Sequence, residues 1–213
     1  MAKRGCFIVD GFNLYHSLRE VEHQQGGSCH WLDLPGLCSS YLPLIGGGAV
    51  LGSIYYFSAL ATHRSSGTVA RHQIFIEALQ ARGVTIGLGN FKAKDLYQTC
   101  PACGRHIHIK RHEEKETDVN IAVKLVEVAA DGSCDAVMVI TGDTALVPAV
   151  AAARRLQPQV DVYMLFPTNR SNLAFDGVAT GTFKIAGKQY AKHQLPDPVV
   201  TAAGRAIRKP SGW

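Results

Sequence analysis

The sequence has no long hydrophobic run, and no stretch approaches the roughly 20 apolar residues needed to cross a membrane. At the N-terminus a short apolar run meets Asp10 at once, which does not match a signal peptide. We therefore expect a cytoplasmic protein that does not contact a membrane. Charged residues make up only 18% of the chain against 46% hydrophobic residues, so we expect a sizeable core rather than disorder.

Motifs that would indicate two other classes of enzyme are also missing. No G-x-G-x-x-G follows the first apolar run, which disfavours a dinucleotide-dependent oxidoreductase. A phosphatase of the haloacid-dehalogenase type needs a second acid two residues after the first, and here that residue is Phe12. The excess of basic residues is small, 22 Lys and Arg against 17 Asp and Glu. Such a balance suits a nucleic-acid partner without requiring one.

The six cysteines include one close pair, Cys100-x2-Cys103, and there is no second CxxC. Cysteines of a cytosolic chain are expected to be reduced. The CPxCG motif is typical of half a zinc site. Two of His106, His108 and His112 would complete such a site, or the missing ligands would come from elsewhere in the chain or from another subunit. The alternative is a solvent-facing hairpin that binds no metal.

Apolar runs alternate with amphipathic segments along most of the chain. The runs predict strands at 5–9, 49–60, 84–91, 135–140 and 160–167. They are continuous rather than alternating, which is typical of a mostly parallel sheet covered by helices on both faces. We predict a single α/β domain over residues 1–187. It carries a Cys- and His-containing excursion at 90–113, and an irregular basic tail follows at 188–213.

Acidic residues stand where two of the predicted strands end. Asp10 follows the first strand and Asp143 follows the strand at 135–140. If these strands are neighbours, the two carboxylates face one crevice, where a divalent cation would neutralise their repulsion. Asn13 lies one helical turn after Asp10 and can point to the same place. Asp118 opens a helix whose start the sequence alone does not place at that edge. Each acid on its own would be read as a turn or helix cap, and the joint pattern is what indicates a site.

Three blocks of sequence, FIVDGFNLYHSL, EEKETDVNIAVKLVEVAADGSCDAVMVITGD and LVPAV, together resemble the NYN domain family of PIN-like metal-dependent ribonucleases. The resemblance spans most of residues 5–185. It implies a Rossmann-like three-layer α/β/α fold and an endoribonuclease that hydrolyses RNA phosphodiester bonds with Mg²⁺ or Mn²⁺. By motif match, the family's site positions are Asp10, Asn13, Asp118 and Asp143, and the three acids are the implied metal ligands.

The sequence departs from the family pattern at Ala145. The family commonly has GDSDL or GDSDF, whereas this chain has GDTAL. An Ala side chain cannot bind a metal, so the chain is either a naturally weakened or inactive member or a form whose acid was replaced. The alternative function is that of an RNA-binding pseudonuclease or regulatory module that does not cleave.

Basic and polar residues near the predicted site are candidates for contacts with RNA phosphates, which add affinity without reading sequence. The candidates are Arg105, Lys110, Arg111, Lys115, Asn169 and Arg170. The competing interpretations are a solvated charged loop for the excursion and a helix cap for the segment 169–172. A homodimer is compatible with the sequence.

Overall fold

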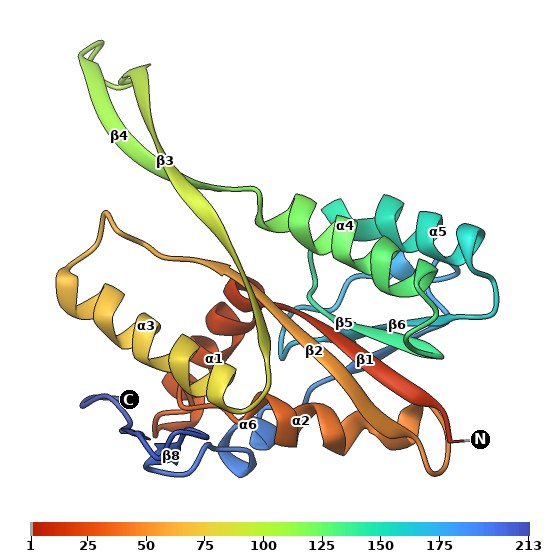
Figure 1. Ribbon diagram of the computed structural model, residues 1–213. Helices are drawn as coiled ribbons and strands as arrows, with labels where there is room; N and C mark the ends of the chain where they lie inside the picture. Colours follow the sequence, from red (N-terminus) through yellow and green to blue (C-terminus); the bar gives the residue numbers. More distant parts are fainter. Residues whose placement is uncertain (1) are drawn as a thin grey trace.

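The computed structural model describes residues 2–213, which form a seven-stranded sheet between two layers of helices (Figure 1). The strand order is β4-β3-β2-β1-β5-β6-β7. All neighbouring strands are parallel except β3 and β4. The strands are β1 (Arg4–Asp10), β2 (Val50–Ala59), β3 (Thr85–Thr99), β4 (His106–Lys115), β5 (Ala136–Ile140), β6 (Asp161–Phe166) and β7 (Gly181–Lys184).

Helices cover both faces of the sheet. One face carries α1 (Gly11–Gln25), α2 (Leu34–Tyr41), α3 (Ser66–Ala81) and α6 (Lys188–Lys192), and the other carries α4 (Thr117–Ala130) and α5 (Val147–Leu156). Three short 3-10 helices are η1 (Leu42–Leu44), η2 (Thr144–Leu146) and η3 (Leu173–Phe175). No helix within residues 2–213 is both long and apolar enough to span a membrane.

Two hydrophobic cores lie on the two faces because successive side chains of a strand point to opposite sides. In β1, Phe7 and Val9 enter the core under α1, whereas Cys6 and Ile8 enter the core under α4 and α5. This use of both faces explains why the strands read as continuous apolar runs. The predicted mostly parallel three-layer α/β/α fold is confirmed.

The excursion predicted at 90–113 is a long β-hairpin. The last ten residues of β3, from Asn90 to Thr99, pair with all ten residues of β4. The resulting ribbon projects from the sheet away from the body of the molecule (Figure 1). β4 returns the chain so that Lys115 lies opposite Asn90, next to the point where Gly89 pairs with the last residue of β2, Ala59. The helix α4 therefore starts at the carboxyl edge of the parallel strands.

The segment after residue 187, predicted to be an irregular tail, is irregular over most of its length but packs against the body of the molecule. The segment contains α6 and a small antiparallel pair of strands, β8 (Val199–Val200) and β9 (Ala206–Ile207). Its apolar side chains are buried in the core that also holds α1; they are Tyr190, Leu195, Val199 and Ile207. These side chains are scattered among prolines and basic residues, so no helical or strand period reveals them in the sequence.

Candidate functional site

The acids predicted from the sequence come from neighbouring strands. β1 pairs with β5, and Val9 lies beside Ile140 at the ends of the two strands. The next residue of β1 is Asp10, which is only 5% exposed. Burial raises the pKa of Asp10, and the negative charges of Asp118 and Asp143 act in the same direction. The three carboxylates therefore lie close enough to repel one another.

A threonine connects the two strand ends. The buried Thr141 hydroxyl donates a hydrogen bond to Asp10 Oδ2 over 2.8 Å and accepts one from the Asp143 N–H over 3.1 Å. The other oxygen of Asp10 accepts the Asn13 N–H over 3.0 Å, which caps α1. Asp143 caps η2 by accepting the Ala145 N–H over 2.9 Å. The sequence reasoning missed Thr141, whose only signal is a hydroxyl directly after a buried strand.

Asp118 reaches the site because of a tight turn between β4 and α4. Glu116 has a left-handed backbone with φ 78°, and its carboxylate accepts a 3.0 Å hydrogen bond from Asn90 Nδ2. The turn lies so close to β3 that a Cβ added to Gly89 would be 2.6 Å from the Lys115 carbonyl oxygen. Burial, followed by the charge of Asp143, raises the pKa of Asp118.

A fourth carboxylate, that of Glu114, belongs to the same cluster. It is half-buried, and its Oε1 is buried with no hydrogen-bond partner among the described residues. Burial raises the pKa of Glu114 to about 7, and the charges of Asp10 and Asp118 also raise it. The sequence reasoning included Glu114 in a family block but did not select it. Strand alternation is the signal, since it separates Glu114 from Glu113, which pairs with Lys94 and Lys115.

The raised pKa of Glu114 predicts an unusual pH dependence of stability. A carboxyl group whose pKa is higher in the folded state stabilises the fold most below its unfolded pKa, and this contribution is lost as pH rises through the folded pKa. Without metal, the melting temperature should therefore fall between pH 4.5 and about 7. The raised pKa values of Asp10 and Asp118 act in the same sense. The melting temperature of Glu114→Gln, measured in EDTA, should fall less steeply with pH than that of the parent protein. The same pH dependence in both proteins would contradict the assignment of the raised pKa to Glu114.

These side chains fit a divalent cation. None of the four carboxylates has an ion-pair partner within residues 2–213. One of their oxygens is orphaned, and a purely oxygen donor set suits Mg²⁺ or Mn²⁺. Within residues 2–213, however, no three His, Cys, Asp or Glu side chains are arranged so that they could hold a metal ion. Binding of a cation would therefore require these neighbouring carboxylates to move closer together.

Ala145 lies beside this cluster, on η2. It is exposed, and its N–H is bound to Asp143. A longer side chain at this position would extend into solvent rather than into the core. The family's second acid can therefore be restored here without disturbing the packing.

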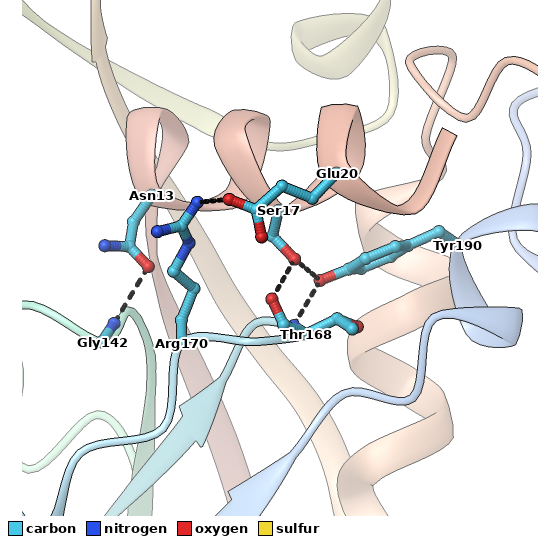
Figure 2. A network of polar contacts seen from close by, with 7 residues as sticks. All are labelled: Asn13, Ser17, Glu20, Gly142, Thr168, Arg170 and Tyr190. Carbon is cyan, nitrogen blue, oxygen red and sulfur yellow. Dashed lines mark hydrogen bonds and ion pairs between the residues drawn. The ribbon is translucent and has the colours of Figure 1, made fainter. Parts of the chain in front are cut away.

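Side chains on one face of α1 bind the turns that follow β5 and β6, and these two turns form the rim of the site (Figure 2). Asn13 Oδ1 accepts the Gly142 N–H over 3.0 Å, and Glu20 forms an ion pair with Arg170. A Cβ at Gly142 would lie 2.1 Å from the Arg170 carbonyl oxygen, so the two turns touch through their backbones. Arg170 was predicted to contact RNA, but its guanidinium is held by α1. Asn13 braces the turn that carries Asp143.

The third residue on this face of α1, Ser17, is buried and links α1 to the segment after β6. Its hydroxyl donates to the Thr168 carbonyl oxygen over 2.8 Å and lies 2.9 Å from the Tyr190 hydroxyl. The Thr168 N–H donates to the same Tyr190 oxygen over 3.1 Å (Figure 2). Residues 13, 17 and 20 share a helix face. The rim is thus fixed from α1 and α6 together.

The basic residues of the hairpin do not gather at the acids. Lys115 points with Glu113 to the opposite ribbon face from Glu114 and bonds Glu113 over 3.0 Å. Arg105 lies at the tip, nine residues before Glu114. At about 3.3 Å per residue of extended strand, this places Arg105 roughly 30 Å from the acids. Lys110 and Arg111 are exposed between these ends, and Asn169 is exposed after β6. Closeness in sequence was a poor guide because the hairpin is extended.

The four predicted zinc ligands also do not come together. No group of three or more potential ligands forms at the tip in the described part of the chain. His106 Nδ1 is 3.2 Å from the Thr99 hydroxyl. His108 Nε2 is 2.7 Å from Asp95, and its ring stacks on Tyr97. The zinc site that these two histidines were predicted to complete therefore stays a prediction, and in this structure each histidine has a partner on β3.

A groove of about 970 Å³ opens beside Glu114. Its walls come from α1, the end of β2, α3, the base of the hairpin and the C-terminus. His63 and His112 stack across it with ring centroids 4.1 Å apart. Aromatic, histidine and arginine side chains dominate its lining, among them Phe12, His16, Arg19, Arg64, Arg71, Phe91 and Trp213. The groove offers flat rings and positive charge next to the acids.

Comparisons with known proteins agree with this architecture. The crystal structure of a protein of unknown function from Vibrio parahaemolyticus has a similar fold, with a TM-score of 0.55 and 16% sequence identity, and the match covers 91% of this chain and 97% of that one. No curated protein matches this chain. The NYN domain profile matches residues 8–183, which includes both strand ends and Asp118. The chain belongs to the NYN domain family, and its fold is that of the PIN-like nucleases.

Proposed function

We propose that the protein is a metal-dependent endoribonuclease. The observation that carries this proposal is the cluster of four carboxylates, from Asp10, Glu114, Asp118 and Asp143, with no ion-pair partner among the described residues. Repelling carboxylates are costly unless a cation joins them. Family membership supports a nuclease over other uses of such a site.

In this proposal Asp10, Asp118 and Asp143 hold Mg²⁺ or Mn²⁺. A cation held there would supply polarisation of a phosphoryl oxygen and a lowered pKa of water, the chemistry that hydrolysis of a phosphodiester needs. Glu114 Oε1 is unpartnered, and the pKa of this carboxyl group is about 7, which suits a group that accepts a proton near neutral pH. Thr141, whose hydroxyl bonds to both residues, fixes the position of Asp10 relative to Asp143.

The groove beside Glu114 supports RNA as the substrate. Unpaired bases stack on aromatic and histidine rings, and arginines neutralise phosphates. Arg64 is exposed at the carboxyl edge in the segment after β2, and Arg71 lines the same groove from α3. An RNA strand lying in this groove would pass next to the carboxylate of Glu114.

The test is cleavage of a labelled RNA carrying unpaired segments, with Mg²⁺ or Mn²⁺ and with EDTA. We expect internal cuts in the presence of metal and none in EDTA. The protein should also melt at a higher temperature when Mn²⁺ is added, because the cation relieves the repulsion within the cluster. Metal-independent cleavage, or no rise in melting temperature, would count against the proposed site.

A pair of arginine variants tests the proposed path of the RNA. Arg64→Ala should weaken RNA binding several-fold at low salt and lower the salt dependence of binding by about one phosphate contact. Arg155→Ala, on the exposed end of α5 across the sheet, is the matched control and should bind RNA normally. Equal losses in both variants would indicate unspecific attraction.

A second candidate function is RNA binding without cleavage. The observation that favours it is Ala145, which leaves the site one carboxylate short of the family pattern. The same assay separates the two functions, since a pseudonuclease would bind the RNA through the groove and leave it intact with every metal.

A further inference from the structure

The tip of the β3–β4 ribbon is a tight turn around two cysteines, Cys100 and Cys103. The Cys100 N–H donates to the Arg105 carbonyl oxygen over 2.8 Å, and the Gly104 N–H donates to the Cys100 carbonyl oxygen over 2.9 Å. Gly104 has φ +68°, a conformation that favours glycine. This turn needs none of the chain beyond residues 99–106, so the two cysteines are held together locally.

Both sulfur atoms are available for a ligand. Neither cysteine forms a disulfide, and Cys103 is exposed. The backbone N–H groups of Ala102 and Cys103 point to the Cys100 sulfur. Such N–H groups can donate to the sulfur of a metal-bound thiolate, so the shape of this turn suits a metal ligand.

Two cysteines are half of a closed zinc site, which takes four ligands. The nearby histidines lie along the ribbon rather than at the pair, His106 beside Thr99 and His108 beside Asp95. No third ligand joins the pair anywhere in residues 2–213. The ribbon projects away from the body of the molecule, so the body cannot reach its tip, whereas a second molecule can (Figure 1).

One face of the ribbon carries three apolar side chains beside the tip, and Lys94 and Arg111 pair next along the same face. Leu96 pairs directly with Ile109, and Ile107 is two residues from Ile109, so all three side chains share a face. Ile107 and Ile109 are each 42% exposed. Lys110 and His108 lie on the opposite face, which continues towards His112 and the groove. Two ribbons packed through these apolar side chains, with a two-fold axis along their length, would bring the two tips together.

We propose that a zinc ion is bound between two copies of this chain, with Cys100 and Cys103 of each copy as its four ligands. Binding releases one proton from each of the four thiols and leaves a zinc–tetrathiolate with a net charge of −2. Arg105 follows each turn directly and supplies one positive charge from each copy. The ribbons would then leave open the faces that carry His106, His108 and Lys110.

The test uses untagged full-length protein purified with a non-thiol reductant, supplied with zinc and then desalted. We expect one zinc ion for every two chains by elemental analysis and twice the chain mass by light scattering. Extended dialysis against EDTA should remove the zinc and return the protein to a single chain. The readouts are metal content and mass, so they do not depend on the proposed nuclease function.

Two variants make the assignment specific. Cys103→Ser should lose both the zinc and the dimer, with an unchanged melting curve for the body because the tip makes no contact with it. His106→Ala/His108→Ala should keep one zinc per two chains. One zinc ion per single chain, loss of zinc in the histidine variant, or no retained zinc in the parent protein would each overturn the proposal.

Discussion

Ala145→Asp is expected to raise metal-dependent RNA cleavage on the order of 100-fold, equivalent to roughly 2.7 kcal/mol of transition-state stabilisation. The new carboxylate would stand in the first turn of η2, one residue from Thr144 and two from Asp143, which caps that turn. Position 145 is exposed, so the substitution should not disturb the core. Initial cleavage rates at several Mg²⁺ and Mn²⁺ concentrations measure the effect.

Ala145→Asn is the matched control, because it has the same shape and no charge. If charge on the cation is what matters, Asn should give little of the increase. The affinity for Mn²⁺, measured by the rise in melting temperature, should follow the same order of variants. Equal and undetectable cleavage by the parent and by Ala145→Asp with both metals would show that Ala145 is not what limits activity.

Asp10→Asn should have opposite effects on activity and on stability. Removing the most buried of the proposed ligands should lower cleavage on the order of 1000-fold. In EDTA, however, the variant should melt about 3 °C higher than the parent protein, because the buried charge and its repulsion from Asp118 and Asp143 are gone. The amide oxygen can still accept the Asn13 N–H.

Thermal melts with and without Mn²⁺ separate these effects. The parent protein should gain stability from Mn²⁺, and Asp10→Asn should gain much less. Asp176→Asn, an exposed acid after η3, is the control and should leave activity, melting temperature and metal response unchanged. A variant that melts lower than the parent protein in EDTA would mean that Asp10 stabilises the fold as a carboxylate.

The architecture could be predicted from the sequence because strands that are buried on both faces appear as continuous apolar runs. β1 and β5 are apolar at every core position, and the acids follow at their ends. Those two facts predicted the parallel sheet and its functional edge. The family match confirms the recognition made from the three sequence blocks. The roles of Asp10, Asn13, Asp118 and Asp143 stay predictions that the proposed experiments test.

The parts that escaped prediction depend on contacts distant in sequence. Glu114 differs from Glu113 in the ribbon face that it occupies, and strand alternation separates the two only once the ends and register of β4 are known. Arg170 looked free to bind phosphate because its partner Glu20 is 150 residues away. The register of β3 and β4, which brings Thr99 to His106 and Asp95 to His108, likewise depends on contacts that the CPxCG motif does not reveal.

The hydroxyl of Tyr190 has a consequence for where this protein can be divided. The family profile ends at residue 183, yet Tyr190 meets both Ser17 and the backbone of Thr168 at the rim. The unit recognised by sequence similarity is therefore shorter than the unit that folds. Shortening the chain to the recognised limits would leave the acids in place while freeing the segment that adjoins them. In this protein Tyr190, whose hydroxyl helps to hold the rim of the site, lies outside the region by which its relatives are identified.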